Sequence, residues 1–178
     1  LAQASISLNK IDAVAVTNGP GSYTGLRVGL SSAKGFCYAL NKPLITIGNL
    51  PALAYASVMN KKDEWPEGTL FCSMIDARRM EVFTAVYNKQ MEELKGPSAM
   101  ILDSDSYSEL LEKNTLVFSG SGAIKWSRLN TSKNAHYLFE TDTTAAFSHL
   151  SYKKFIQKDF ADLKYSEPLY VKEFFFAS

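Results

Sequence analysis

The spacing of apolar positions along this chain of 178 residues predicts strands and helices that follow one another. A β-branched apolar run over 11–17 stops at Asn18-Gly19-Pro20-Gly21, which indicates a buried strand that ends in a turn. Apolar side chains then recur at intervals of three and four from Leu26 to Leu40, as on one helical face. We expect this helix to begin at residue 24 or 25, and a strand over 44–47 to complete a strand–helix–strand unit of a parallel sheet.

The chain changes character after the polar run over 60–64, where we place a domain boundary. Two β-rich runs over 70–76 and 81–87 are separated by Ala77-Arg78-Arg79-Met80, the pattern of an antiparallel hairpin. The other predicted elements are a helix with Pro51 in its first turn, a helix capped by Asp103 or Ser104, a strand over 116–118 that leads into a glycine turn at 119–122, and a helix from about residue 143 to residue 160. The fold class is therefore α/β, in two lobes.

Composition narrows the range of functions. With 46% hydrophobic and 21% charged residues the chain can bury a core, and its formal net charge of +1 gives no field that would draw it strongly onto a phosphate backbone. Cys37 and Cys72 lie in apolar runs without CxxC spacing, which indicates buried thiols in a reducing compartment, so we expect a cytoplasmic protein. No apolar stretch approaches the roughly 20 residues that span a bilayer, and we expect no membrane contact. The chain begins with Leu1 rather than methionine, so we expect its true N-terminus to be missing.

The glycine-rich turn between the first strand and the first helix is a candidate ligand site. Such a turn can present backbone N–H groups and a positive helix end to an anion, although its spacing is neither that of a P-loop nor GxGxxG. The alternative is that its glycines only allow a tight turn with unusual backbone angles. The candidate residues are Gly19, Gly21, Ser22, Thr24, Gly25 and Arg27.

Small side chains on the first helix form a second candidate surface. Gly29 and Gly35 each cost about 1 kcal/mol in a helix interior, which suggests that another helix approaches closely there. That helix can belong to this chain or to a partner. Gly29, Ser32, Ala33 and Phe36 are spaced so that they could lie along one seam, with Phe36 as an anchor.

Charged residues around the predicted hairpin form the third candidate site. Arg78, Arg79 and Glu81 are either solvated turn residues with a weak surface ion pair or a group that faces the cleft between the lobes and contacts a ligand or a partner complex. Asp76, at the end of the first strand of the hairpin, is a further candidate for this cleft. His136 and His149 lie thirteen positions apart and do not have metal-ligand spacing, so we expect neither a metal site nor a catalytic residue.

Four segments, in this order, resemble the bacterial TsaB family, also called YeaZ. The most specific is NGPGSYTGLRVGLSSAKG over 18–35. The sequence over 75–83 is similar to the family's Asp-Ala-Arg hairpin, residues 120–126 to its glycine turn, and residues 167–170 to its C-terminal motif.

The resemblance implies an actin-like ATPase (ASKHA, ribonuclease H-like) fold with two lobes, each a mixed sheet flanked by helices. The first lobe would occupy residues 1–63 without its first strands, the second 64–164, and the segment 165–178 would return to the first lobe. The family implies a non-catalytic partner of the TsaD threonylcarbamoyl transferase, which works with TsaE and binds through first-lobe helices, or a homodimer through the same helices. ATP and metal would then lie on TsaD, with no cofactor in this chain and only indirect contact with tRNA.

Two other functions stay open. A small-molecule kinase or ATPase of the same superfold would need an aspartate base in its cleft, for which Asp76 is the candidate, and intact phosphate loops. A metalloprotease would need clustered ligands for a metal ion, which the two distant histidines do not supply.

Overall fold

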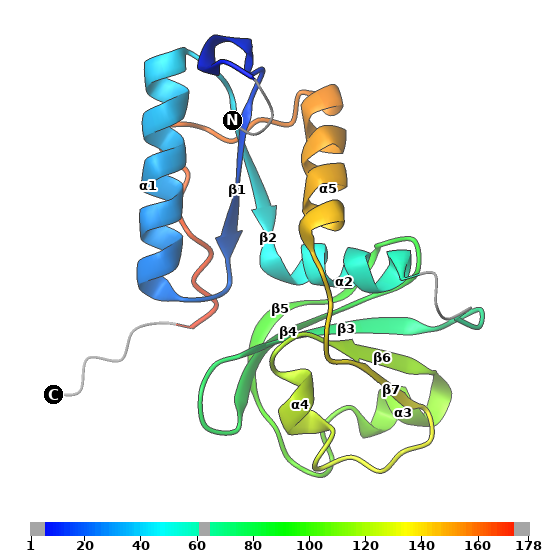
Figure 1. Ribbon diagram of the computed structural model, residues 1–178. Helices are drawn as coiled ribbons and strands as arrows, with labels where there is room; N and C mark the ends of the chain where they lie inside the picture. The colour runs from blue at the N-terminus through cyan, green and yellow to red at the C-terminus, as the bar shows by residue number, and fades with distance from the viewer. Residues whose placement is uncertain (1–5, 61–64, 173–178) are drawn as a thin grey trace, which may run out of the picture. The chain divides into compact units, whose positions relative to one another are not determined.

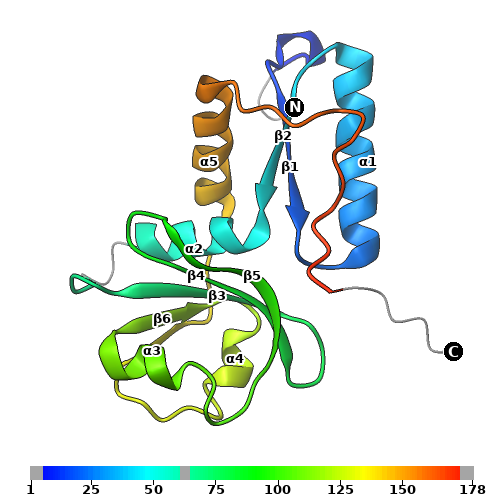
Figure 2. The same ribbon diagram turned by 180° about the vertical axis from the view of Figure 1, so that it is seen from behind.

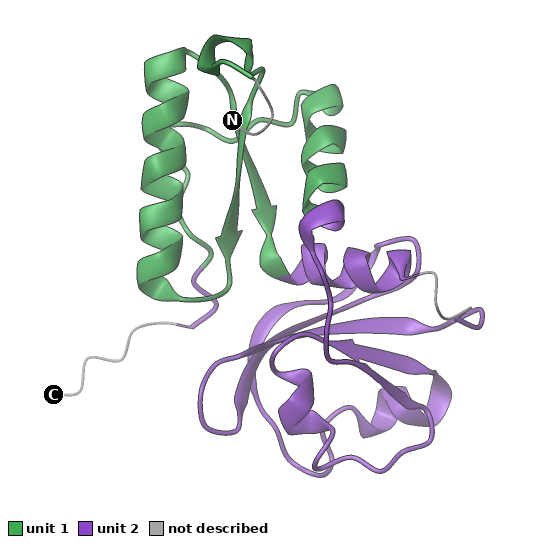
Figure 3. Ribbon diagram, viewed as in Figure 1, with its two compact units in different colours: residues 1–49, 147–169 green, residues 50–146, 170–178 purple. Residues whose placement is uncertain are grey.

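The computed structural model describes residues 6–60 and 65–172. The chain divides into two compact units, one formed by residues 1–49 and 147–169 and the other by residues 50–146 and 170–178 (Figure 3). The boundary that the sequence predicts at residues 63 and 64 lies outside the described residues. Within these described ranges, no helix is long and apolar enough to cross a membrane.

The first unit is built on a strand–helix–strand motif. After a short 3₁₀ helix, Leu8–Lys10, strand β1 (Val14–Gly19) is followed by helix α1 (Tyr23–Leu40) and strand β2 (Leu44–Gly48), and β1 pairs with β2 in parallel. In both views the two strands lie between α1 and the part of α5 (Thr144–Gln157) that belongs to this unit (Figures 1 and 2). The predicted unit of a parallel sheet is therefore confirmed.

Local chemistry sets the ends of α1. The Ser22 hydroxyl accepts a hydrogen bond from the backbone N–H of Gly25 at 3.3 Å, so the helix begins at Tyr23, slightly before the predicted start. Asn41 adopts a left-handed conformation with φ of 51° and ends the helix. The buried face of α1 carries Leu26, Leu30, Ala33 and Cys37, the last three of which pack with Leu44 of β2.

The second unit holds a five-stranded mixed sheet in the order β5-β4-β3-β6-β7. Its strands are β3 (Leu70–Asp76), β4 (Glu81–Tyr87), β5 (Glu93–Ile101), β6 (Leu116–Ser119) and β7 (Ala135–Leu138). The β3–β4 and β4–β5 pairs are antiparallel, whereas β3–β6 and β6–β7 are parallel. Helix α2 (Asn49–Met59) lies on one face of this sheet, and α3 (Ser108–Lys113) and α4 (Ala123–Trp126) lie on the other (Figures 1 and 2).

Side chains of this sheet alternate between two buried clusters, as the twofold repeat of a strand requires. The cluster on the α2 face consists of Leu50, Ala54, Phe71, Ala85, Tyr87 and Val117. The cluster on the opposite face is larger and includes Cys72, Met74, Val82, Phe118, Tyr107, Leu111 and Trp126. Burying both faces explains why β3 and β6 read as almost continuous apolar runs.

Several expectations need correction. The described sheet of the first unit has two parallel strands and is not mixed; only the second unit contains a mixed sheet. The two units are also divided at other positions than the expected lobes: α2 groups with the second unit and residues 147–164 with the first. Of the C-terminal segment, residues 165–169 group with the first unit, and Tyr170 to Lys172 group with the second.

Candidate functional site

The hairpin that joins β3 to β4 lies beside the glycine turn, so two of the four segments that resemble the TsaB family meet there. Asp76 ends β3 and Glu81 begins β4, with Ala77 to Met80 forming the turn. Ser121 and Lys125, from the glycine turn and α4, contact Asp76, and Lys172, two positions after the C-terminal motif, contacts Glu81. Segments up to 91 positions apart therefore meet at one hairpin of the second unit.

Asp76 is the anchor of the turn. Its backbone N–H donates to the hydroxyl of Ser121 at 3.0 Å, and one carboxylate oxygen accepts from Lys125 Nζ and from the backbone N–H of Arg78, both at 2.6 Å. Lys125 Nζ also donates to the Glu81 carbonyl at 3.3 Å, so one lysine ties the two strands together. The hydrogen bond from Lys125, assisted by that from Arg78, holds the pKa of Asp76 below its ordinary value.

Arg78 and Arg79 hold an unusual backbone conformation. Their φ angles are 74° and 47°, in the left-handed region that residues other than glycine rarely occupy. Such a conformation costs on the order of 1–3 kcal/mol per residue and persists only where the surroundings impose it. The hydrogen bonds between Ala77 N and Glu81 O and between Glu81 N and Arg78 O, both 3.0 Å, supply that constraint.

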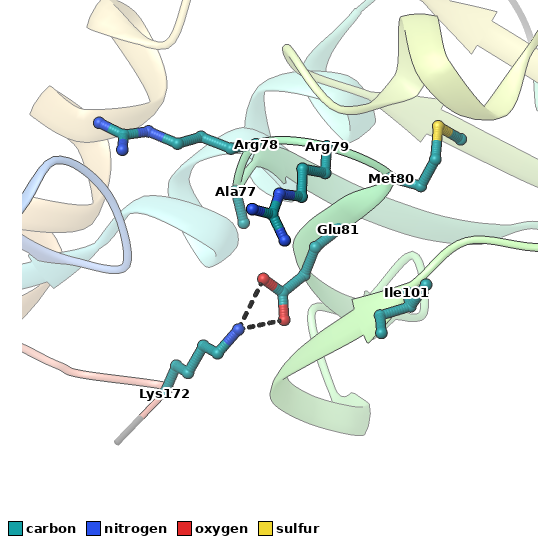
Figure 4. A pocket seen from close by; sticks show the side chains of 7 residues that line it. All are labelled: Ala77, Arg78, Arg79, Met80, Glu81, Ile101 and Lys172. Carbon is teal, nitrogen blue, oxygen red and sulfur yellow. Dashed lines mark hydrogen bonds and ion pairs between the residues drawn. The ribbon is translucent and has the colours of Figure 1, made fainter. Parts of the chain in front are cut away.

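A cavity of about 520 Å³ lies at the tip of this hairpin (Figure 4). The carboxylate of Glu81 lies on one side, where both of its oxygens accept hydrogen bonds from Lys172 Nζ at 2.9 Å, and the Arg79 guanidinium extends over the same side. Met80 and Ile101 form the apolar side, held together because Leu102 N–H donates to the Met80 carbonyl at 2.8 Å. Arg78 also lines the cavity, but its side chain extends away from the ion pair in Figure 4.

The glycine-rich turn of the first unit has a well-defined geometry. Gly19 has a φ of 117°, and a Cβ there would lie 2.8 Å from the carbonyl oxygen of Leu169, whose N–H donates to Asn18 O at 2.7 Å. Asn49 Nδ2 donates to the Pro20 carbonyl at 2.9 Å. At Gly19, glycine is therefore required for a close backbone approach, which agrees with the structural alternative for this residue.

The other residues of this turn lie at the start of α1. Ser22 caps the helix, Thr24 and Gly25 are exposed, and the Arg27 guanidinium lies 3.9 Å above the ring of Tyr23. Gly21 is half-buried, and a Cβ on it would be 3.3 Å from Asn49 Nδ2. Whether these residues also bind a ligand stays a prediction.

The proposed seam on α1 is only partly exposed. Ser32 and Phe36 are exposed, Phe36 by 52%, and Gly29 is half-buried with Val16 Cγ2 3.7 Å from the position of a Cβ. Ala33 is 5% exposed and packs in the core of its own unit, so its inclusion in an exposed seam was wrong. Val28, 62% exposed, lies on the exposed side of the same helix and was missed.

The histidines and cysteines lie apart from these sites. The ring of His136 packs edge-on against Trp65, and Cys37 and Cys72 are both buried and free. Burial raises the pKa of the Cys72 thiol to about 11. Across the residues that the structure describes, no group of three or more His, Cys, Asp or Glu side chains could hold a metal ion.

Sequence reasoning selected Asp76, Arg78, Arg79 and Glu81 at this hairpin. It did not select Met80, which lies between Arg79 and Glu81 and lines the same cavity. Lys125 and Lys172 gave no local signal, because their role depends on contacts 49 and 91 positions away.

Known proteins resemble about half of this chain in sequence and almost all of it in fold. Among curated proteins, the tRNA threonylcarbamoyladenosine biosynthesis protein TsaB of Haemophilus influenzae is 40% identical over 83 residues. The tRNA N6-adenosine threonylcarbamoyltransferase of Symbiobacterium thermophilum is 37% identical over 92 residues. These stretches cover 47% and 52% of this chain but 33% and 26% of those relatives, so the chain spans a third or less of their length.

Two solved structures from Pseudomonas aeruginosa have the same fold. One, an uncharacterized protein with similarity to peptidase YeaZ, has a TM-score of 0.76 at 19% identity, over 96% of this chain and 78% of that one. The other, YeaZ, has a TM-score of 0.74 at 20% identity, over 95% and 78%. The fold is therefore YeaZ-like, and the resemblance stated from the motifs is confirmed. Since the matching family model covers residues 1–169, the chain belongs to the family described as TsaD, tRNA N6-adenosine threonylcarbamoyltransferase.

Proposed function

We propose that this chain is a non-catalytic partner subunit of a TsaD-type transferase, acting in the synthesis of threonylcarbamoyladenosine on tRNA. The observation that carries the proposal is the 40% identity over 83 residues to a protein named for that biosynthesis, TsaB, within a family match over residues 1–169. The YeaZ-like fold over 96% of the chain supports it. In this proposal the two units are the lobes of an actin-like fold, the complex is cytoplasmic, and ATP, metal and tRNA are bound by the transferase and a TsaE-like ATPase.

The environment of Asp76 favours an accessory role over the kinase alternative. A general base works best when its pKa lies near the operating pH. Asp76 instead has a lowered pKa, and its carboxylate already accepts hydrogen bonds from Lys125 and Arg78. Its chemistry is that of an ionised turn anchor, which suits a scaffold better than a proton acceptor.

The exposed side of α1 is the surface that we propose for the transferase partner. Val28 and Phe36 are large apolar side chains more than half exposed on it, with exposed Ser32 between them along the helix. An apolar anchor beside small residues allows another helix to approach closely. A homodimer through the same side is the alternative occupant.

The direct test is co-purification of the full-length natural protein with the TsaD-type transferase of the same organism, followed by mass spectrometry of threonylcarbamoyladenosine in tRNA. We expect a stable complex, and tRNA modification that is lost when the gene for this protein is deleted. A deletion strain with normal modification would refute the proposal.

The α1 surface is tested with Ser32→Arg and Phe36→Ala. We expect each to weaken transferase binding at least about tenfold, since a buried anchor typically contributes 2 kcal/mol or more. Tyr38→Ala is the matched control, because Tyr38 is 83% exposed on the same helix but, two positions after Phe36, points to another side of it. Equal binding by Ser32→Arg, Phe36→Ala and the control would show that the partner binds elsewhere.

A further inference from the structure

Two of the positively charged side chains that line the hairpin cavity do not stabilise the fold through a polar contact with another described residue. Among the residues that the structure describes, the guanidinium groups of Arg78 and Arg79 form neither an ion pair nor a hydrogen bond. A single arginine without an ion pair is common on a protein surface. Arg78 and Arg79 differ from that case because both line one cavity and both have a backbone conformation that is energetically costly.

The hairpin is fixed in place before any ligand arrives. Asp76 holds the backbone N–H of Arg78, and Lys125 joins Asp76 on β3 to the Glu81 carbonyl on β4. Ser121 fixes the backbone of Asp76 from the glycine turn. A site on a constrained turn loses little entropy when it binds, so these contacts favour recognition by the side chains that the turn presents.

The charges around the cavity suit a dianion. Arg78, Arg79 and Lys172 supply three positive charges, and Glu81 is the one carboxylate among the residues that line it. The resulting double positive excess matches a phosphate monoester, which carries a charge of about −1.5 to −2 at neutral pH. The guanidinium group donates two parallel hydrogen bonds to such oxygens.

The opposite side of the cavity is apolar. Ile101 lies opposite Glu81 in the register of β4 and β5 and is 73% exposed, and Met80 lines the same cavity from the turn. A branched aliphatic side chain and a flexible thioether in one lining give apolar surface that the ring of a ligand can contact. The volume of about 520 Å³ falls within the range of small-molecule sites, about 300–1,000 Å³.

We propose that the cavity binds a small phosphorylated molecule, with its phosphoryl group at Arg79 and Lys172 and an apolar or aromatic body over Met80 and Ile101. Arg78 lines the cavity and adds to its positive charge, although its side chain extends away from the ion pair in Figure 4. A small molecule is favoured over a nucleic-acid backbone because the site is a cavity and the whole chain has a net charge of only +1. This inference goes beyond the proposed function, and its test requires no transferase.

The experiment uses AMP as the probe, since it joins a phosphate monoester to a flat ring, with inorganic phosphate and adenosine as its two halves. Calorimetry and amide chemical shifts are recorded on the complete chain. We expect AMP to bind more tightly than phosphate, adenosine to bind least, and the shifts to centre on residues 77–81, 101 and 172. Equal affinities for AMP and phosphate would show that Met80 and Ile101 do not contact the ligand, and would overturn that part of the proposal.

Three variants separate a built site from nonspecific attraction. Arg79→Gln should weaken AMP binding at least about tenfold, because it removes a charge-assisted pair of hydrogen bonds. Glu81→Gln should strengthen binding several-fold, because it removes the carboxylate that competes for Lys172. Lys154→Gln is the control, since Lys154 pairs with Asp159 on α5, in the other unit.

Circular dichroism establishes that each variant is folded before binding is measured. Absence of saturable binding by AMP and phosphate up to millimolar concentration would overturn the proposal, as would equal losses in Arg79→Gln and Lys154→Gln. A short RNA that binds the same residues more tightly than AMP would show that the phosphoryl group belongs to nucleic acid and would overturn the assignment to a small molecule.

Discussion

At the scale of single residues, Asp76 decides the conformation of the hairpin. Its carboxylate and backbone together contact Arg78 in its own turn and Ser121 and Lys125 in the segment 120–126. The functional side chains of the turn therefore depend on a residue that need not itself touch a ligand. Without its hydrogen bonds from Lys125 and Arg78, the Asp76 carboxylate would be the first candidate for a catalytic base.

The contribution of Asp76 to stability should depend on pH. Because its pKa is lowered in the folded protein, chiefly by Lys125, Asp76 stabilises the fold above its unfolded value of 3.8, and this contribution disappears as the pH falls through the folded value. Asp76→Asn should lower the free energy of unfolding by about 1 kcal/mol at pH 7 and by progressively less as the pH falls below 3.8. Urea unfolding at several pH values measures the difference.

Asp159→Asn provides the comparison for this measurement. The Lys154–Asp159 pair, at 3.0 Å, is a solvent-exposed ion pair on a helix end, so its loss should change stability by about 0.5 kcal/mol or less. If the difference between wild type and Asp76→Asn instead grew as the pH fell, the carboxylate would not be stabilised by Lys125 as the structure indicates.

At the scale of elements, two glycines with opposite surroundings show how turns and helices constrain this chain. Gly120, after β6, has a φ of 92°, and a Cβ there would lie 2.4 Å from both the Met74 carbonyl oxygen and Leu53 Cδ2. Gly35, inside α1, has nothing within 4 Å of the same position. The first glycine is required by packing, and the second is a local weakness of its helix.

Alanine substitutions should therefore act in opposite directions at these positions. Gly120→Ala should destabilise the protein by about 3 kcal/mol or more, because it combines a backbone clash with an unfavourable φ. Gly35→Ala should stabilise it by about 0.5–1 kcal/mol, because alanine restricts the unfolded chain and favours the helix. The midpoints of urea unfolding report both changes. A stable Gly120→Ala variant would show that the loop after β6 can move away from β3.

The sequence predicted those elements whose formation depends on their own residues, and it missed those that depend on their place in the fold. β3 and β4 were predicted with their observed bounds, because both are bounded runs rich in apolar and β-branched residues. β5 was missed because it contains Gly96 and Pro97, which are tolerated only because this strand lies at the edge of the sheet. For α3, Asp103 was taken as the cap, but its carboxylate instead accepts a hydrogen bond from the Ser106 hydroxyl before the helix begins.

The same distinction applies to the candidate sites: residues close in sequence could be grouped, and residues that only the fold brings together could not. The hairpin residues Asp76, Arg78 and Glu81 were found because they are close in sequence. Lys172 could not be assigned to them, since only the fold brings it to Glu81. Ala33 was misplaced because residues three and four positions apart share a side of a helix, and that spacing alone does not say where the core begins.

At the scale of the whole molecule, net charge bears on how the protein would contact tRNA in the role proposed for it. Its 19 basic and 18 acidic side chains nearly cancel, so the molecule as a whole has no basic surplus with which to hold a polyanion. The charge excess at the hairpin cavity is local and small. The chain should therefore reach tRNA through its partner rather than by its own field.

Fluorescence anisotropy with labelled tRNA tests this directly. The chain alone should show no binding tighter than the nonspecific range of about 10⁻⁴ to 10⁻⁶ M at physiological salt, and its affinity should change little with salt because few counterions are released. Adding the transferase should retain tRNA, and Arg79→Gln in that complex should leave retention unchanged, since the cavity is proposed for a small molecule. Submicromolar binding by the chain alone would mean that a local basic surface contacts tRNA directly, and an accompanying loss in Arg79→Gln would place that surface at the hairpin.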